Sequence, residues 1–123
     1  MKPNALVDFQ TAQELKAIGF DSPTSPYFDK KGTLKGPRGV VLLKTFNNNR
    51  GYSFFSAPKW DTAARWLRFQ GYYIQVSLTP DYKFNLDIAS REPYLVRNYG
   101  IYSNYKEAII QGVKEAINII KQK

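Results

Sequence analysis

The chain has 123 residues, a length typical of one domain, and its 43% hydrophobic content is typical of a globular protein. It contains no cysteine and no histidine, which excludes disulfide frameworks, thiolate or imidazole catalysis and the common zinc sites. Eighteen lysine and arginine residues against ten acidic residues give a net charge of +8, which favours an anionic partner.

The first predicted element is a helix in residues 8–20, DFQTAQELKAIGF. Asp8 or Thr11 can cap its start, because a short polar side chain accepts hydrogen bonds from the free N–H groups of a first helical turn. Gly19 suits the left-handed conformation in which many helices end. We therefore expect the helix to stop at Gly19.

Two hairpins are predicted next. Residues 27–34 indicate a short one, and a longer one is indicated by two apolar runs, residues 40–46 and 52–57, on either side of an Asn-rich loop. The intervening KGPRG is a connecting loop, because a strand follows it where a phosphate loop requires a helix. Its Lys35 and Arg38 remain candidates for contact with an anion.

A second helix is predicted from Pro58, which suits a first helical position, to Gly71, which stops it. Four residues at helical spacing form its expected buried face: Trp60, Ala63, Ala64 and Leu67. Trp66 borders this face, and Arg65 and Arg68 fall outside it.

Strands follow, with side chains that alternate between two faces. In the first strand the inward set is Tyr72, Ile74, Val76 and Leu78, whereas Tyr73 begins the outward set. The return strand, after a turn at TPDY, alternates Tyr82, Phe84, Leu86 and Ile88 against Lys83, Asn85 and Asp87. The segment YLVRNYGIY is typical of one or two further strands.

The last predicted helix begins at the cap Asn104, with Glu107 three residues on. Its apolar stripe comprises Tyr105, Ala108, Ile109, Gly112, Val113, Ala116, Ile117 and Ile120. A glycine in mid-helix costs about 1 kcal/mol relative to alanine. Gly112 therefore predicts close packing against a neighbouring element.

This order of elements predicts an α+β fold, an antiparallel sheet with helices packed on one face, as a single domain over residues 1–123. No apolar run approaches the ~20 residues that span a bilayer. The start of the chain has no apolar signal-peptide region. We therefore expect a cytoplasmic protein without a membrane partner.

Four segments, taken in order, resemble a family of small proteins: LKAIGF, AP followed by WDTAARWLR, GYYIQV, and YSNYKEAIIQGVKEAINII. That family is common in gut bacteria of the Bacteroides type and in their phages and mobile elements. The resemblance covers the chain apart from residues 36–56, and it departs at SNYKEA, where an extra residue separates Ser103 from Tyr105. It implies an accessory protein of a phage or mobile element, and it transfers no catalytic residue.

Five residues of the second half are candidates for an outward binding surface: Arg65, Arg68, Tyr73, Lys83 and Trp66. Basic grooves with aromatic side chains are typical of single-stranded nucleic-acid binding, because bases stack on the rings. The alternative is that the two arginines are solvated helix charges and that Tyr73 half-covers an open sheet face.

An enzyme is not expected. The ten acidic residues are dispersed along the chain, and capping, turn-forming and solubility roles account for nearly all of them. No cofactor and no metal are expected either. Catalysis would have to rest on lysine, tyrosine, serine or carboxylates alone.

The sequence thus favours a non-enzymatic binding module whose partner is anionic, with nucleic acid as the leading class. The alternative is a protein-interaction module, for example for a host protein, without nucleic-acid binding. In that case the segment YLVRNYGIY is an edge strand that pairs with a partner sheet or with itself. The oligomeric state stays open at this stage.

Overall fold

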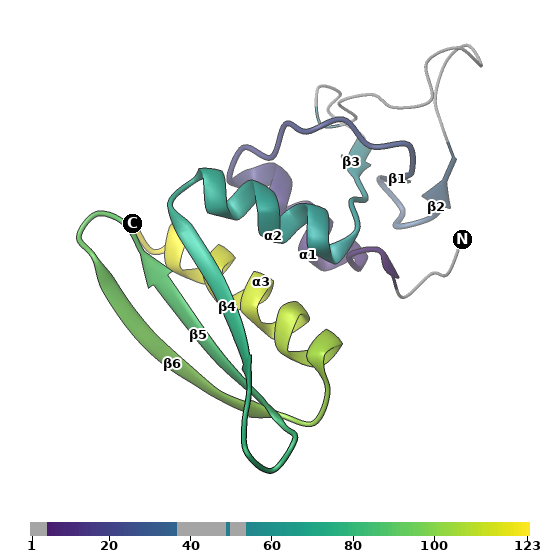
Figure 1. Ribbon diagram of the computed structural model, residues 1–123. Coiled ribbons are helices and arrows are strands. Elements are labelled where there is room, and N and C mark those ends of the chain that lie inside the picture. The colour runs from purple at the N-terminus through teal and green to yellow at the C-terminus, as the bar shows by residue number, and fades with distance from the viewer. Residues whose placement is uncertain (1–4, 37–48, 50–53) are drawn as a thin grey trace. The chain divides into compact units, whose positions relative to one another are not determined.

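The computed structural model describes residues 5–36, 49 and 54–123. Its contacts divide the chain into two compact units, unit 1 (Met1–Lys59) and unit 2 (Trp60–Lys123) (Figure 1). Both units combine helix with an antiparallel three-stranded sheet. The prediction of an α+β fold is therefore confirmed. That residues 1–123 make one domain stays a prediction.

Unit 1 contains helix α1 (Phe9–Ala17) and strands β1 (Tyr27–Asp29), β2 (Leu34–Lys35) and β3 (Phe54–Ser56). β1 lies in the middle of the sheet and is antiparallel to both neighbours. The short hairpin predicted from residues 27–34 is thus confirmed. The longer hairpin falls for the most part outside the described residues, which include only residues 54–57 of its second strand and Asn49.

The ends of α1 follow the sequence signals. The Asp8 carboxylate caps the helix by accepting a hydrogen bond of 2.7 Å from the Thr11 N–H. Gly19 adopts a φ of 98°, and the Phe20 N–H donates to the Leu15 carbonyl at 2.9 Å. This left-handed turn satisfies carbonyls that the helix leaves free at its C-terminus.

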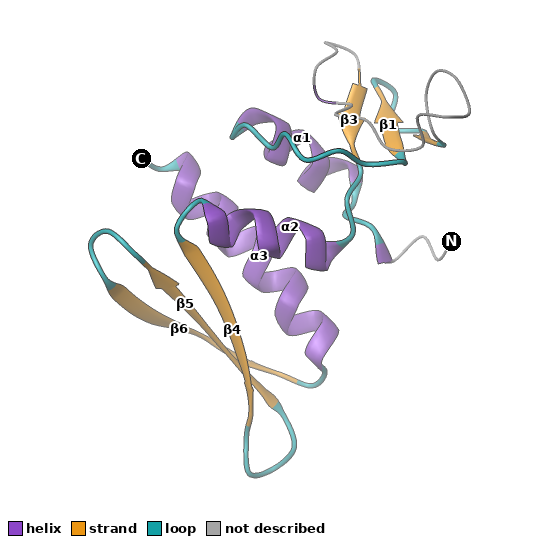
Figure 2. Ribbon diagram, turned by 45° about the horizontal axis from the view of Figure 1, so that its top comes forward, coloured by secondary structure: helices purple, strands orange, loops and turns teal. Residues whose placement is uncertain are grey.

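Unit 2 runs α2 (Trp60–Phe69), β4 (Tyr72–Leu78), β5 (Phe84–Ser90), β6 (Leu95–Tyr102) and α3 (Tyr105–Lys121). Its sheet has the order β4-β5-β6, with β5 antiparallel to both neighbours. Figure 2 shows both helices on the same side of this sheet. The arrangement matches the predicted sheet with helices on one face.

The buried face of α2 differs from the prediction. Trp66, expected at the border, is buried and only 7% exposed, whereas Ala64 is half-buried. The reason is that the buried arc is centred on Ala63, which places Trp66 on one flank and Trp60 on the other. The helix also begins at Trp60, two residues after Pro58.

The alternation of β4 and β5 is confirmed except at the ends. Leu86 and Ile88 are buried, and their direct partners on β4 are Val76 and Ile74. Leu78, predicted to be inward, is 62% exposed because it lies at the end of the strand, beyond the helical cover. Tyr82, predicted as a strand residue, belongs to the turn, where its φ of 63° is incompatible with a strand.

Helix α3 is seated on the sheet through Gly112. A Cβ atom at this position would lie 2.5 Å from Ile74 Cγ2 on β4 and 3.1 Å from Leu86 Cδ1 on β5. Because glycine has no side chain, the backbone of α3 can lie directly against these two strands. The predicted close packing is confirmed. Of the predicted stripe, Tyr105 is the exception, because it is 52% exposed in the first turn.

Gly112→Ala should lower the free energy of unfolding by about 1 kcal/mol. The gain in helix propensity of about 1 kcal/mol is outweighed by overpacking against two core side chains, which costs about 1–3 kcal/mol. The matched control is Asn118→Ala, an exposed position of the same helix, which should raise stability by about 0.5 kcal/mol. Urea unfolding measures both changes. Stabilisation by Gly112→Ala would show that the sheet is not closely packed against the helix at this position.

Candidate binding groove

The structure does not bring the predicted binding residues together. Arg65 and Arg68 are exposed on α2, which lies on the helical side of the sheet. Tyr73 alternates with the buried Tyr72 and thus points to the opposite face. Lys83 precedes β5 at the far end of the hairpin, since Phe84 pairs with Leu78 and Ala89 pairs with Tyr73.

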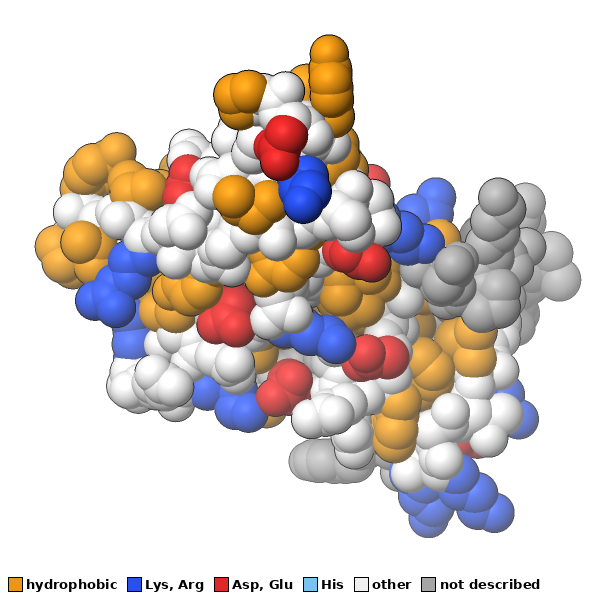
Figure 3. All heavy atoms as spheres, turned by 90° about the horizontal axis from the view of Figure 1, so that it is seen from below, with side chains coloured by type: hydrophobic (Ala, Val, Ile, Leu, Met, Phe, Trp, Pro, Cys, Tyr) orange, Lys and Arg blue, Asp and Glu red, His pale blue; other side chains and the backbone are white. Residues whose placement is uncertain are grey.

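The other predicted residues add nothing to such a surface. Trp66 is buried, so its ring is not available for stacking on a partner. Lys35 is exposed at the end of β2 in unit 1, and Arg38 lies outside the described residues. On the face drawn in Figure 3, basic side chains lie among acidic and apolar ones instead of forming a continuous band.

A β-bulge in β6 is the first feature that sequence reasoning missed. Asn85 pairs with Ile101 and Asp87 pairs with Asn98, so that two residues of β6 face one residue of β5. Gly100, one of these two residues, has a φ of 104°. The bulge interrupts the regular edge of the strand after Asn98.

The Asn98 side chain holds this bulge in place. Its Nδ2 group donates to Asn85 Oδ1 at 2.7 Å, to Asp87 Oδ1 at 3.1 Å and to the Leu86 carbonyl at 3.2 Å. Its Oδ1 accepts a hydrogen bond of 3.1 Å from the Gly100 N–H. The side chain thus satisfies backbone groups that the irregular pairing leaves free. This cluster of amides and one carboxylate has a structural role.

A groove lies between the first half of β6 and the C-terminal end of α3. Its volume is about 290 Å³. Apolar and aromatic side chains supply part of its lining, among them Tyr72, Ile88 and Leu95 from the sheet and Ile119 from the helix. The groove forms because β6 is the edge strand of the sheet, next to the β5 that carries α3.

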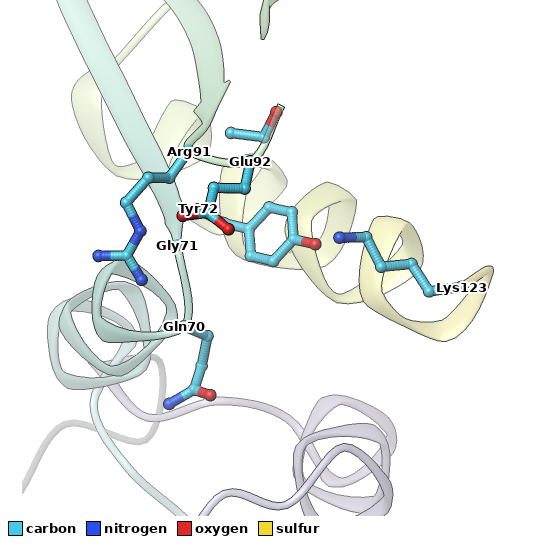
Figure 4. A pocket seen from close by; sticks show the side chains of 7 residues that line it. Gln70, Gly71, Tyr72, Arg91, Glu92 and Lys123 are labelled. Atoms are coloured by element: carbon cyan, nitrogen blue, oxygen red, sulfur yellow. The ribbon is translucent and has the colours of Figure 1, made fainter. Parts of the chain in front are cut away.

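A second hollow of about 250 Å³ adjoins the groove and shares Tyr72, Ser90, Glu92 and Lys123 with it. We call the two together the α3–β6 groove. Figure 4 shows the Lys123 ammonium at the end of the Tyr72 ring that carries the hydroxyl group. The ammonium nitrogen lies 5.1 Å from the ring centroid, which is within the range of a cation–π contact.

Basic groups dominate the rim of the α3–β6 groove. Arg91, Arg97 and Lys123 line it, against the single carboxylate of Glu92. Arg91 is positioned by the end of α2, where its N–H donates to the Gly71 carbonyl at 3.0 Å. Gly71 has a φ of 98°, and a Cβ atom there would lie 3.7 Å from the Arg91 guanidinium. The rim therefore presents a local excess of positive charge above an apolar floor.

The sequence contains only a weak signal for this groove. Leu95, Arg97 and Tyr99 alternate along YLVRNYGIY, and all three line the groove from one side of β6. Their partners Tyr72 and Lys123 come from two other elements, so no local motif connects them. For this reason the predicted binding residues did not include Arg91, Arg97 or Lys123.

The two carboxylates whose pKa values are shifted, Asp29 and Asp81, both lie in turns. A hydrogen bond from the Thr79 hydroxyl lowers the pKa of Asp81, and one from the Thr33 N–H lowers the pKa of Asp29. Both shifts favour the ionised form, which is the opposite of what a general acid requires. Among the described residues no three acidic side chains gather into a metal-binding group. No described helix is long and apolar enough to cross a membrane.

Comparison with protein-family models gives no match, and comparisons with curated proteins and with solved structures give none either. The resemblance to small proteins of Bacteroides-type bacteria and their phages stays a prediction. The α3–β6 groove is therefore the feature that bears on function.

Tyr102 offers a pH-dependent test of how the bulged strand is held. Its hydroxyl donates to the Tyr99 carbonyl at 2.9 Å, and burial, with a smaller effect of Glu115, raises the pKa of the phenol above its ordinary value of 10.0. A raised pKa in the folded state means that this contribution to stability is present below pH 10 and is lost as the pH rises through the folded pKa.

Tyr102→Phe should therefore lower stability by about 1 kcal/mol at pH 7 and lose less stability than the wild type above about pH 10. The control Tyr94→Phe changes a side chain that is 78% exposed and should stay within about 0.5 kcal/mol of the wild type at pH 7. Urea unfolding between about pH 7 and 11 measures both. An alkaline loss as steep as that of the wild type would contradict a role for the Tyr102 phenol.

Proposed function

We propose that this chain is a non-enzymatic binding module that holds an anionic group of a partner protein in the α3–β6 groove. The observation that carries this proposal is that Arg97 of β6 and Lys123, which follows α3, line a hollow with an apolar floor. Arg91, from the turn between β5 and β6, lines the adjoining hollow. Binding sites are typically concave and mostly apolar, with a few polar groups that fix the ligand.

The charge of unit 2 supports an anionic ligand. Unit 2 contains nine lysine and arginine residues and six acidic residues, a net charge of +3. Three of these cations face the α3–β6 groove with one carboxylate. Arginine binds carboxylates through paired hydrogen bonds, and the lysine ammonium adds a point charge. A partner carboxylate would thus be attracted and oriented at this rim.

A protein partner is favoured over nucleic acid. Single-stranded nucleic acid needs exposed rings for its bases and a basic track for its phosphates. Tyr72, the ring at the centre of the groove, is only 5% exposed. Tyr73 shares its sheet face with Asp87, whose carboxylate would repel phosphates. A host protein is also compatible with an accessory protein of a phage or mobile element, which is what the resemblance implies.

Fluorescence anisotropy with three labelled probes tests the proposal: a decaglutamate peptide, an oligothymidylate and an RNA duplex. We expect the peptide to bind at low salt, and Arg97→Glu combined with Lys123→Glu to weaken it by at least about tenfold, because two attractive contacts become repulsive. Both side chains lie at the rim, and Arg97 is exposed, so the variant should remain folded.

The matched control is Arg65→Glu combined with Arg68→Glu, which changes the net charge equally but on α2. We expect it to weaken peptide binding by less than about threefold, through long-range electrostatics alone. Equal losses in both double variants would show that only the total charge matters. Tighter binding of DNA or RNA than of the peptide, with loss in the α2 variant, would overturn the proposal in favour of nucleic acid.

A further inference from the structure

We infer that the partner segment is an extended acidic peptide that pairs with the open edge of β6 at residues 95–98 and places a carboxylate opposite Arg97. The inference rests on the proposed function and specifies the partner that the α3–β6 groove would take. Strand addition of this kind derives affinity from backbone hydrogen bonds and specificity from alternate side chains.

The edge of β6 offers the backbone groups for such pairing. In the described part of unit 2, β6 pairs with β5 alone, so its other side has no partner strand. The start of the strand is exposed, with Leu95 44% and Val96 42% accessible. The bulge at Gly100 then ends the regular edge. The geometry therefore limits the pairing to a short segment before the bulge.

The α3–β6 groove lies beside this edge and would receive the side chains of an added strand. Leu95, Arg97 and Tyr99 point into the groove from β6, and Ile119 lines it from α3. In a sheet, residues opposite each other on adjacent strands share a face. Every second side chain of the added strand would thus lie opposite Leu95 or Arg97, and the next one would reach Tyr99 just beyond the paired residues.

The pattern of these neighbours specifies the chemistry of the added strand. Opposite charges directly across two strands stabilise the pair, and apolar side chains pair with apolar or aromatic ones. A carboxylate is therefore expected opposite Arg97, with an apolar side chain two residues before it and another two residues after it. Lys123 and Arg91 supply further positive charge at the same end of unit 2.

An acidic segment fits this edge better than a second copy of the chain. Two copies paired through β6 would bring together two surfaces that each contain Arg91, Arg97 and Lys123 with one compensating Glu92. Each unit 2 also has a net charge of +3. Like charges of this kind repel across an interface, whereas an acidic strand neutralises them.

The probe for this inference is the heptapeptide Thr-Val-Thr-Glu-Thr-Val-Thr, whose Val, Glu and Val side chains share one face of a strand. It is titrated into the ¹⁵N-labelled full chain and followed by amide chemical shifts. Two N-methylated versions separate strand pairing from simple docking: one methylated at the central Glu and both Val residues, the other at the inner Thr residues. In a strand, alternate N–H groups point to opposite sides.

Strand addition requires that one methylated version binds about tenfold more weakly or not at all, because its ladder hydrogen bonds are blocked, while the other stays within about threefold of the unmethylated probe. If both methylated versions bind equally and Arg97→Glu with Lys123→Glu still weakens their binding, strand addition is overturned and the proposed function stays intact. If these two substitutions change the affinity for neither the heptapeptide nor decaglutamate, the proposed function itself fails.

A charge exchange tests the position of the carboxylate. Arg97→Glu should weaken binding of the heptapeptide by about tenfold. The Arg97→Glu protein should also bind the Glu-to-Lys analogue of the peptide better than the wild type does. The control Arg65→Glu, with the same change of charge on α2, should discriminate between the two peptides as the wild type does. If the preference for the two peptides is not exchanged, the acidic strand is not the occupant. The same conclusion would follow if sedimentation showed dimers of the free chain that disappear on Arg97→Ala.

Discussion

The backbone of α3 approaches the sheet of unit 2 at Gly112 so closely that a Cβ atom there would overlap Ile74 and Leu86. This contact ties the helix to β4 and β5, the two strands that contribute these side chains. Ala108, Val113, Ala116 and Ile117 are then completely buried along the same helix. The edge strand β6 lies to one side of this contact, and the α3–β6 groove is the space between its first half and the end of the helix.

The groove combines an apolar floor, which belongs to the core, with charged side chains at its rim. Tyr72 and Ile88 belong to the buried face of the sheet, so that the floor is apolar. Arg97 is exposed on an edge strand, where charged residues also discourage uncontrolled pairing with other sheets. A charge that protects an edge from apolar strands selects, by the same electrostatics, for a strand with a carboxylate. Protection and specificity then have one physical origin.

Much of the fold could be predicted because its signals are local. The Asn104 side chain accepts a hydrogen bond from the Glu107 N–H at 2.8 Å, as the capping pattern predicts, and Gly112 marks a close approach that the structure contains. The alternation of β4 and β5 identified their buried faces. One error occurred where a residue's environment depends on distant segments, because Trp66 is buried instead of lying at the border. Another is local, because the hydrogen bonds between Thr79 and Lys83 extend the turn to include Tyr82.

The proposed binding site was the part that local patterns could not predict. The basic residues chosen from the sequence were neighbours along α2 or alternated with core positions, but the structure places Arg65, Tyr73 and Lys83 in different regions of unit 2. The α3–β6 groove combines residues as distant in sequence as Tyr72 and Lys123. It depends on the position of α3 over the sheet and on the bulge held by Asn98, and both result from long-range contacts.

We propose that the partner binds at the open edge of β6. Amide hydrogen exchange of the full chain, measured by NMR with and without saturating heptapeptide, reports directly on this edge. We expect alternate amides between Leu95 and Asn98 to become protected, because only those that point away from β5 gain a new acceptor. Protection confined to α2 or to the face of Tyr73, or unchanged exchange along β6 in the bound state, would contradict it.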